Sequence, residues 1–300
     1  MIISGSRGLH HTSATKRSPP DCAAAHIDWR YVVKLDSQFR KLGDLTGRTA
    51  LITGASSGIG AATVRTFLQA GAKVHGVARR EDALRETAPE YLKSGQYVVH
   101  PMDVADGEAV QALADELAKS DPIDTLILAA GRNVNPRRFG DLTFEAFDDL
   151  MKVNLNGVFY FMRATLPQLR ENMGDVVVIS SVAALWPDHS GAAYQATKAG
   201  VIGLARGAGW DEHGAGVRIT SILPGVVNTP ILDKRPSPPP AELRAWFIQP
   251  EDVAMASLAA VTMPGRTTVS EITLTATRLQ SIGNTQQATP ALPAELMNKA

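Results

Sequence analysis

The sequence predicts an α/β protein with a doubly wound parallel sheet of about seven strands, covered by helices on both faces and folded as one domain. Two observations predict this class. Short apolar, β-branched runs alternate with longer amphipathic segments from residue 44 onward, and a glycine-rich turn follows the first run. Continuous apolar strands that alternate with helices are typical of a parallel sheet buried on both faces. Right-handed crossovers then place the helices on both sides of the sheet.

Seven runs have the length and composition of buried strands. They span residues 48–53, 72–78, 96–100, 124–130, 175–180, 217–223 and 270–276. Residues 58–72 and 108–120, which lie between strands, carry the apolar spacing of amphipathic helices. The proline-rich stretch 234–240 interrupts the alternation and is not expected to form regular structure.

Composition excludes several classes of protein. The 300 residues are 44% hydrophobic, which is enough for a substantial core, and the formal net charge is zero, which argues against a nucleic-acid partner. No run approaches the ~20 apolar residues of a membrane span. Cys22 is the single cysteine, so no internal disulfide can form, which favours a reducing, cytoplasmic location.

The two ends differ from the domain expected over 44–276. Residues 1–43 read as an N-terminal extension that is either disordered or an organelle-targeting peptide, and 277–300 read as a C-terminal tail. Prolines and glycines interrupt any amphipathic helix in the extension, which makes targeting the less favoured reading. His10 and His11 have no partner at metal-ligand spacing, so we expect no metal site.

A glycine-rich turn, "TGASSGIG", joins the first strand to the first helix. Gly54, Gly58 and Gly60 let the backbone turn tightly and approach a pyrophosphate, and a helix that begins near Ile59 offers free N–H groups to the phosphates. Ser56 and Ser57 lie within the same loop. The position between strand and helix predicts a Rossmann-like dinucleotide site rather than a purely structural turn.

The end of the second strand indicates which dinucleotide is bound. NAD-specific sites carry an acidic residue ~20 positions after the glycines, whereas an arginine there accommodates a 2′-phosphate. The sequence reads "GVARRED", with Ala78 followed by Arg79 and Arg80. We therefore expect NADP(H) rather than NAD(H), with Arg79 as the contact. The alternative is that both arginines face solvent beside Glu81 and Asp82.

A serine, a tyrosine and a lysine form the candidate reaction centre. Tyr194 and Lys198 are four residues apart, so a helix places both on one face, and the ammonium would lower the pKa of the phenol. Ser181 follows the strand 175–180 and could donate to a carbonyl oxygen, with Ser180 as the competing candidate. Asn154 lies among apolar residues of an expected helix, where its amide could be structural or could hold a water chain.

Together these motifs resemble the short-chain dehydrogenase/reductase family in its compact, single-domain branch. "TGASSGIG", "YQATK" and "LPGVVNTP" match its T-G-x-x-x-G-x-G, Y-x-x-x-K and P-G-x-V-x-T segments over roughly residues 44–275. The resemblance implies a tetrad. Tyr194 would move the proton, Ser181 would polarise the carbonyl, Lys198 would hold the nicotinamide ribose and lower the tyrosine pKa, and Asn154 would anchor a relay water.

The same resemblance implies further cofactor contacts. Asp103 would meet the adenine and Thr229 the carboxamide, although a helix cap and a turn hydroxyl are the respective structural alternatives. The other implied contacts are Val104, Ala130, Gly131, Pro224, Gly225 and Val227. Ala129 departs from the family, which has an asparagine there. The C-terminal segment is similar to NADP-dependent members that oxidise small hydroxy acids and hydroxy amino acids.

The expected activity is hydride transfer between NADP(H) and a small-molecule carbonyl or secondary alcohol, by a homodimer or homotetramer without a metal. A non-catalytic NADP-binding regulator and an epimerase that oxidises transiently are the alternatives. The pocket is expected to be lined by residues 182–193, 132–139 and 226–247. Within them, Trp186, His189 and Arg137 are possible contacts, with core packing and a solvated loop as the alternatives for the tryptophan and arginine.

Overall fold

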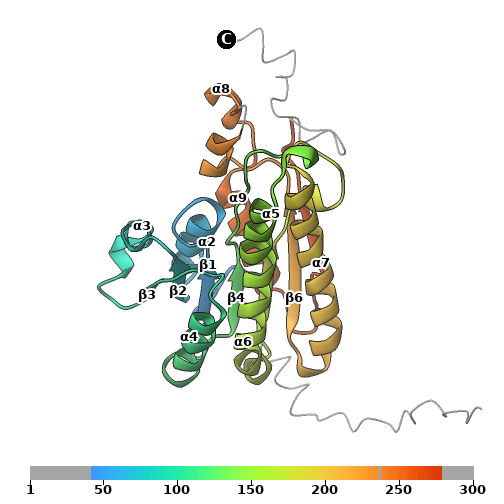
Figure 1. The fold of residues 1–300 in the computed structure, drawn as a ribbon. Coiled ribbons are helices and arrows are strands. Elements are labelled where there is room, and N and C mark those ends of the chain that lie inside the picture. Colours follow the sequence, from blue (N-terminus) through green and yellow to red (C-terminus); the bar gives the residue numbers. More distant parts are fainter. Residues whose placement is uncertain (1–41, 236–237, 279–300) are drawn as a thin grey trace, which may run out of the picture.

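The computed structural model describes residues 42–235 and 238–278, and it contains a single parallel sheet of seven strands in the order β3-β2-β1-β4-β5-β6-β7 (Figure 1). The strands are β1 (Thr49–Thr53), β2 (Lys73–Ala78), β3 (Tyr97–Pro101), β4 (Thr125–Leu128), β5 (Asp175–Ile179), β6 (Arg218–Pro224) and β7 (Glu271–Leu274). The predicted fold class and all seven predicted strands are confirmed. The extension 1–43 and the tail 277–300 lie almost wholly outside the described residues.

Helices cover both faces of the sheet. The longer ones are α2 (Gly58–Gln69), α4 (Gly107–Ser120), α5 (Phe144–Met151), α6 (Gly157–Asn172), α7 (Ala192–Glu212) and α9 (Pro250–Val261), and the shorter ones are α3 (Glu81–Arg85) and α8 (Ala241–Arg244). The single-turn elements are η1 (Pro89–Tyr91), η2 (Phe139–Asp141), η3 (Lys152–Asn156), η4 (Val182–Ala184), η5 (His213–Ala215) and η6 (Pro230–Lys234).

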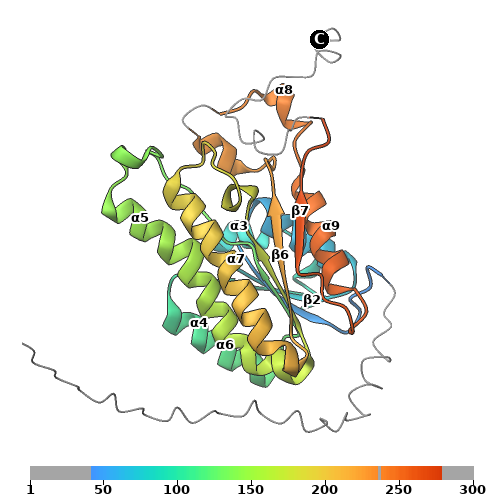
Figure 2. The ribbon, with the colours of Figure 1, turned by 90° about the vertical axis from the view of Figure 1, so that its right-hand side faces the viewer.

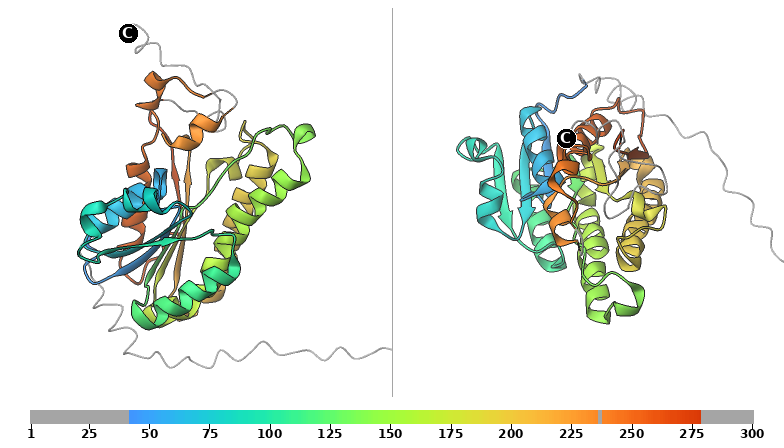
Figure 3. Two further views of the ribbon diagram at one scale, coloured as in Figure 1. Left: turned by 60° about the vertical axis from the view of Figure 1, so that its left-hand side comes forward. Right: turned by 90° about the horizontal axis from the view of Figure 1, so that it is seen from above.

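Two apolar clusters hold these layers together, one on each side of the sheet. Val64 and Phe67 of α2 pack with Val253 of α9 on one side. Leu113 of α4 and Phe161 of α6 lie in the cluster of the opposite side, to which α7 also contributes. Figures 2 and 3 show the sheet between α2 and α9 on one face and α4, α6 and α7 on the other. The expected doubly wound arrangement follows directly from these two buried faces.

Strand order places a crevice between β1 and β4. Successive strands run outward from β1 through β2 to β3 and then, after the chain crosses over, from β4 through β5 and β6 to β7. The loops at the carboxyl ends of β1 and β4 therefore lead to opposite faces, which makes this position the topological switch point of the sheet. Ligands of open α/β sheets bind at this position, and the predicted site residues follow β1, β2, β4, β5 and β6.

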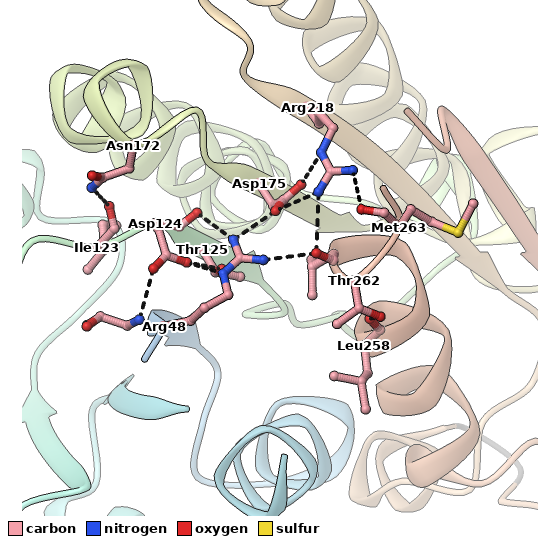
Figure 4. A network of polar contacts seen from close by, with 12 residues as sticks. Arg48, Ile123, Asp124, Thr125, Asn172, Asp175, Arg218, Leu258, Thr262 and Met263 are labelled. Carbon is pink, nitrogen blue, oxygen red and sulfur yellow. Dashed lines mark hydrogen bonds and ion pairs between the residues drawn. The ribbon is translucent and has the colours of Figure 1, made fainter. Parts of the chain in front are cut away.

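The opposite, amino-terminal edge of the sheet is closed by a network of buried charges (Figure 4). Asp175 accepts hydrogen bonds from Arg48 (2.8 Å) and Arg218 (2.7 Å), and Arg48 also pairs with Asp124. These residues lie at or next to the first residues of β1, β4, β5 and β6. The arginines also donate to backbone carbonyls at the end of α9 and just after it, those of Val261 (2.9 Å) and Met263 (2.9 Å). The network fixes the edge remote from the crevice.

Candidate active site

The turn after β1 needs glycine at three positions for three different reasons. Gly54 has φ +69°, and a Cβ there would lie 2.9 Å from the carbonyl oxygen of Ala129. Gly60 is packed so closely that a Cβ would lie 2.2 Å from the carbonyl oxygen of Gly54. Gly58 has φ +53°, and its Cβ would lie 3.1 Å from the Cγ2 atom of Thr229. The turn therefore packs backbone against backbone, and Thr229 lies beside it.

The N-terminus of α2 carries the features of a phosphate site. Ser57 is its N-cap residue but makes no side-chain capping bond, and the first turn contains no acidic residue. Ser56 and Ile59 are only partly buried. Free N–H groups and the positive end of the helix dipole therefore remain for an anion. Together with the glycines, these groups form a cradle that fits a dinucleotide pyrophosphate.

Arg79 and Arg80 follow the carboxyl end of β2, and both are exposed. Sequence reasoning left open whether the neighbouring acids neutralise them. Glu81 instead pairs with Arg85 at 2.8 Å, one turn along α3. Within residues 42–235 and 238–278, neither Arg79 nor Arg80 has an ion-pair partner within 4 Å. The Arg79 guanidinium is thus available to an anion at the end of β2.

The loop after β3 shows that the helix-cap alternative for Asp103 is wrong. Asp106, not Asp103, caps α4, because its side chain accepts from the Ala109 N–H. Asp103 is exposed, and its Oδ1 accepts from the Ala105 N–H, so Oδ2 remains available. Val104 is buried, and the Cβ of any larger residue at Gly157 would lie 3.0 Å from the Val104 carbonyl oxygen.

Thr53 contributes a function that sequence reasoning missed. Its hydroxyl accepts from the Ala130 N–H at 3.2 Å and donates to the Ile127 carbonyl at 3.5 Å. Thr53 is 1% exposed, so this pair ties the end of β1 to the end of β4 inside the sheet. The loop after β4 is therefore held although Ala129 supplies no amide. A threonine at the last position of a buried strand was the only available signal.

The segment after β6 approaches the same edge. Gly225 donates its N–H to the Leu274 carbonyl at 2.8 Å, directly after Pro224, the last residue of β6. Val227 then forms a parallel bridge with Ile248. Thr229 begins the short helix η6, and its hydroxyl lies 3.4 Å from the Val227 carbonyl oxygen. The Thr229 hydroxyl therefore bonds within the turn, as the structural alternative predicted. The Thr229 methyl group lies against Gly58 of the glycine turn.

The two serines after β5 have different partners. Ser180 is 3% exposed and donates to the Lys198 carbonyl at 2.8 Å, which is a structural bond between β5 and α7. Ser181 caps η4 by accepting from the Ala183 N–H at 3.1 Å. That bond leaves the Ser181 hydroxyl proton available for a second partner, and a hydrogen bond from Ser181 lowers the pKa of Tyr194. The structure therefore favours Ser181 over Ser180 as the group that faces a substrate oxygen.

Asn154 lies in the π-helical turn η3 between α5 and α6 and is fully buried. Its Oδ1 accepts from the Arg132 N–H at 2.9 Å, while Nδ2 donates to the Arg132 carbonyl (2.9 Å) and to the Thr197 hydroxyl (3.2 Å). The amide therefore clamps the loop after β4 against α7, and Gly131 lies between Asn154 and Lys198. Sequence reasoning did not identify Thr197, although it lies inside "YQATK".

Tyr194 and Lys198 share one face of α7, as their spacing predicts. Lys198 is 6% exposed, its Nζ donates to the Ile179 carbonyl at 2.8 Å, and Nζ lies 5.7 Å from the centre of the Tyr194 ring. Burial lowers the pKa of Lys198 to about 8. Burial also raises the pKa of Tyr194 to about 12, and the nearby Asp188 acts in the same direction.

The groups that lower the Tyr194 pKa are not the ones the sequence suggested. Ser181 lowers it first, followed by Arg235 and Arg137. Lys198 lies beside the ring and donates to the Ile179 carbonyl, and it is not among the groups that shift the pKa of Tyr194. In the segment expected to line the pocket, Trp186 is half-buried and His189 is exposed.

Within the described part of the chain, no group of three potential ligands could hold a metal ion. In the same residues, no helix has the length and apolar character needed to cross a bilayer. The candidate site residues instead present hydroxyl, ammonium, guanidinium, carboxylate and amide groups. These groups suit a phosphorylated organic cofactor and a polar substrate.

The comparisons with known proteins agree with this geometry. Residues 48–239 match the family model described as short chain dehydrogenase. An uncharacterized oxidoreductase from Staphylococcus haemolyticus is 33% identical over 233 residues, which cover 77% of this chain and 98% of that protein. Serine dehydrogenase from Escherichia coli has a TM-score of 0.65 at 28% identity, covering 75% of this chain and 96% of that one.

A metagenomic short-chain oxidoreductase solved in complex with NADP has a TM-score of 0.66 at 28% identity, and the match covers 83% of this chain and 99% of that one. Residues 48–239, which match the family model, contain the glycine turn, the serine after β5 and the tyrosine–lysine pair of α7. With its sheet order, its cofactor cradle and the match over most of its length, the chain belongs to the short-chain dehydrogenase family of oxidoreductases.

Proposed function

We propose that this oxidoreductase transfers a hydride between NADP(H) and a small-molecule carbonyl or secondary alcohol. The observation that carries the proposal is the meeting of Ser181, Tyr194 and Lys198 at the same edge of the sheet as the glycine turn. When bound, the nicotinamide would supply the hydride that forms the new C–H bond at the carbonyl carbon. The carbonyl oxygen would then take a proton from the protein.

The residues of this chain would divide that work. The free proton of Ser181 would stabilise the negative charge that develops on the carbonyl oxygen. Tyr194, whose pKa burial raises to about 12, carries its proton at neutral pH and would donate it. Lys198 would hold the nicotinamide ribose, and Asn154 would fix the loop that faces it while anchoring a relay water.

The proposed preference for NADP(H) over NAD(H) rests on the Arg79 guanidinium, which has no ion-pair partner among the described residues. A fork of N–H donors at the end of β2 suits a 2′-phosphate, and no carboxylate replaces it for the ribose diol. Gly54, Gly58 and Gly60 with Ser56, Ser57 and Ile59 would hold the pyrophosphate; Asp103, Val104, Ala130, Gly131, Pro224, Gly225, Val227 and Thr229 would complete the cofactor site. A reducing cytoplasmic location and a homodimer or homotetramer complete the proposal.

The helices support the oligomer part of the proposal. Phe144 of α5, Phe159 of α6 and Trp210 of α7 are large apolar side chains with 89%, 48% and 77% of their surface exposed. Exposed apolar groups on adjacent helices favour contact with a second copy. Light scattering after gel filtration would report the assembly, and a monomer at micromolar concentration would refute it.

The activity is tested with a panel of carbonyl compounds, following NADPH absorbance with time. Net oxidation of NADPH in proportion to alcohol formed supports the proposal. Binding of NADPH without turnover of any compound would indicate a regulator, and product formation without net oxidation would indicate an epimerase.

The cofactor preference is tested with Arg79→Asp. We expect the NADPH to NADH ratio of kcat/KM to fall by about tenfold or more in this variant. Arg163→Asp introduces the same charge change on the exposed surface of α6 and should leave the ratio unchanged. Preference of the unaltered protein for NADH would refute the assignment.

A further inference from the structure

Three loops that follow neighbouring strands are tied together above Tyr194. Asn133, after β4, donates to the Ser190 carbonyl of the loop after β5 at 2.9 Å. Asn135 donates to the Lys234 carbonyl of the segment after β6 at 2.7 Å. Side-chain amides thus hold the backbone of all three loops in one place. Three charged side chains carried by these loops, Arg137, Asp188 and Arg235, interact electrostatically with Tyr194.

The first of these loops brings Arg137 to the tyrosine. Gly191, just before α7, has φ +91°, and a Cβ there would lie 2.6 Å from the Arg137 carbonyl oxygen. The two backbones are therefore in close contact at the start of the helix that carries Tyr194. The Arg137 side chain is partly buried, and its Nε is 3.4 Å from the Val134 carbonyl oxygen. Burial lowers the pKa of Arg137, and electrostatic attraction to Tyr194 and Asp188 raises it.

The third loop brings a second guanidinium to the same place. Arg235 is partly buried, and its Nη1 is inaccessible to solvent yet has no hydrogen-bond partner among the residues that the structure describes. Burial lowers the pKa of Arg235, and repulsion from Arg137 lowers it further. An unpaired buried donor on a cation is costly, so this arrangement indicates a missing acceptor.

Asp188 does not supply that acceptor. Its Oδ1 accepts from the Ser190 N–H (2.7 Å) and lies 3.4 Å from Nε2 of Gln195, while Oδ2 is buried without a hydrogen bond. Within the described residues, neither Arg137 nor Arg235 forms an ion pair with it. Two guanidiniums and one carboxylate leave the cluster with a net charge of +1 beside the candidate reaction centre.

We infer that Arg137 and Arg235 form a binding site for the carboxylate of the substrate, so that the enzyme acts on short oxo acids and the corresponding hydroxy acids. This inference rests on the proposed function, because it uses Tyr194 as the group that meets the carbonyl. A guanidinium binds a carboxylate through parallel N–H bonds, which would satisfy the orphaned Arg235 donor. A monoanion also balances the net charge of +1, whereas a phosphate dianion exceeds it.

The test compares an acid with its own methyl ester. Acetoacetate and methyl acetoacetate present the same carbonyl, but only the first carries a charge. For Arg235→Gln and for Arg137→Gln, we expect kcat/KM to fall about tenfold or more further with the acid than with the ester, mainly through KM. Arg138→Gln removes an exposed neighbouring guanidinium and should leave kcat/KM unchanged for both the acid and the ester. Calorimetric titration of butyrate into the NADP⁺-loaded protein measures carboxylate binding without turnover.

Each outcome separates this inference from the proposed function. An acid-to-ester ratio that stays the same in both variants overturns the carboxylate site, even if both compounds are reduced. Equal losses on both substrates, with a shifted pH profile, would show that the arginines tune Tyr194 instead. Preference of the unaltered enzyme for glyceraldehyde 3-phosphate would also overturn it. Butyrate binding that weakens in the variants supports the site even if neither carbonyl compound is reduced, in which case only the proposed function fails.

Discussion

Lys198 should make the protein less stable at neutral pH than a variant without the charge. The residue is 6% exposed, and burial lowers its pKa from 10.5 to about 8. One pKa unit corresponds to ~1.4 kcal/mol, so the protonated side chain costs about 3 kcal/mol of folding free energy below pH 8. The bond from Nζ to the Ile179 carbonyl returns about 1–2 kcal/mol. We therefore expect Lys198→Met to be about 1–2 kcal/mol more stable than the unaltered protein at pH 7.

The sign of this difference should change with pH. Between pH 8 and 10.5 the unfolded chain binds more protons at this residue than the native protein does. Stability of the unaltered protein therefore rises with pH relative to Lys198→Met, by about 3 kcal/mol in total. At the upper end the neutral amine still donates to Ile179, so the unaltered protein becomes the more stable one.

Urea denaturation of both proteins at intervals from pH 7 to 10.5 measures the difference directly. Lys93→Met, at an exposed loop position, is the matched control and should show a constant difference. Stabilities of the unaltered protein and Lys198→Met that run parallel over this range would refute the reasoning. Loss of turnover in Lys198→Met together with its gain in stability would show that the protein maintains a buried charge for function at the expense of stability.

Three further predictions follow from other parts of the structure. Asp175→Ala leaves two buried guanidiniums without their shared partner and should lower the free energy of unfolding by about 3–5 kcal/mol in urea, whereas Arg206→Gln breaks an exposed pair and should cost less than about 1 kcal/mol. His75, whose pKa burial lowers to about 4, stays neutral in the native protein while the unfolded chain takes up a proton below pH 6.5. Stability should therefore fall by up to about 3 kcal/mol between pH 6.5 and 4, and His75→Gln should reduce that slope; equal slopes would contradict it. Gly60→Ala places a methyl group against backbone and should weaken NADPH binding about tenfold or more in a fluorescence titration, while Gly203→Ala, with nothing within 4 Å, should not.

Much of the fold could be predicted because burial leaves a simple pattern in the sequence. Strands covered on both faces must be apolar throughout, so β1, β4 and β5 were visible as continuous runs. The glycine turn was equally visible, because the contact between Gly60 and the Gly54 carbonyl excludes every other side chain. Parallel strands end at one edge, so the sequence alone predicts that Ser181 and Tyr194 lie near each other.

The parts that could not be predicted depend on loops without periodicity. Nothing in the spacing of Arg137, Asp188 and Arg235 indicates that they meet. Hydrogen bonds from the side-chain amides of Asn133 and Asn135 hold the three separate loops that carry them together. The direction in which the pKa of Tyr194 shifts could likewise not be predicted from the sequence. Sequence reasoning assigned its control to Lys198 from a four-residue spacing, whereas in the folded protein burial and Asp188 raise the pKa of Tyr194, and Ser181 and the loop arginines oppose them.

The central claim is that Tyr194 donates the proton while NADPH supplies the hydride. Its most direct test is the turnover of Tyr194→Phe with NADPH and a carbonyl compound that the unaltered protein reduces, alongside the Kd for NADPH. A general acid contributes about 10²–10⁴-fold to the rate, so turnover should fall by that factor while the Kd changes less than about threefold. Turnover in Tyr194→Phe within about tenfold of the unaltered protein would contradict the account.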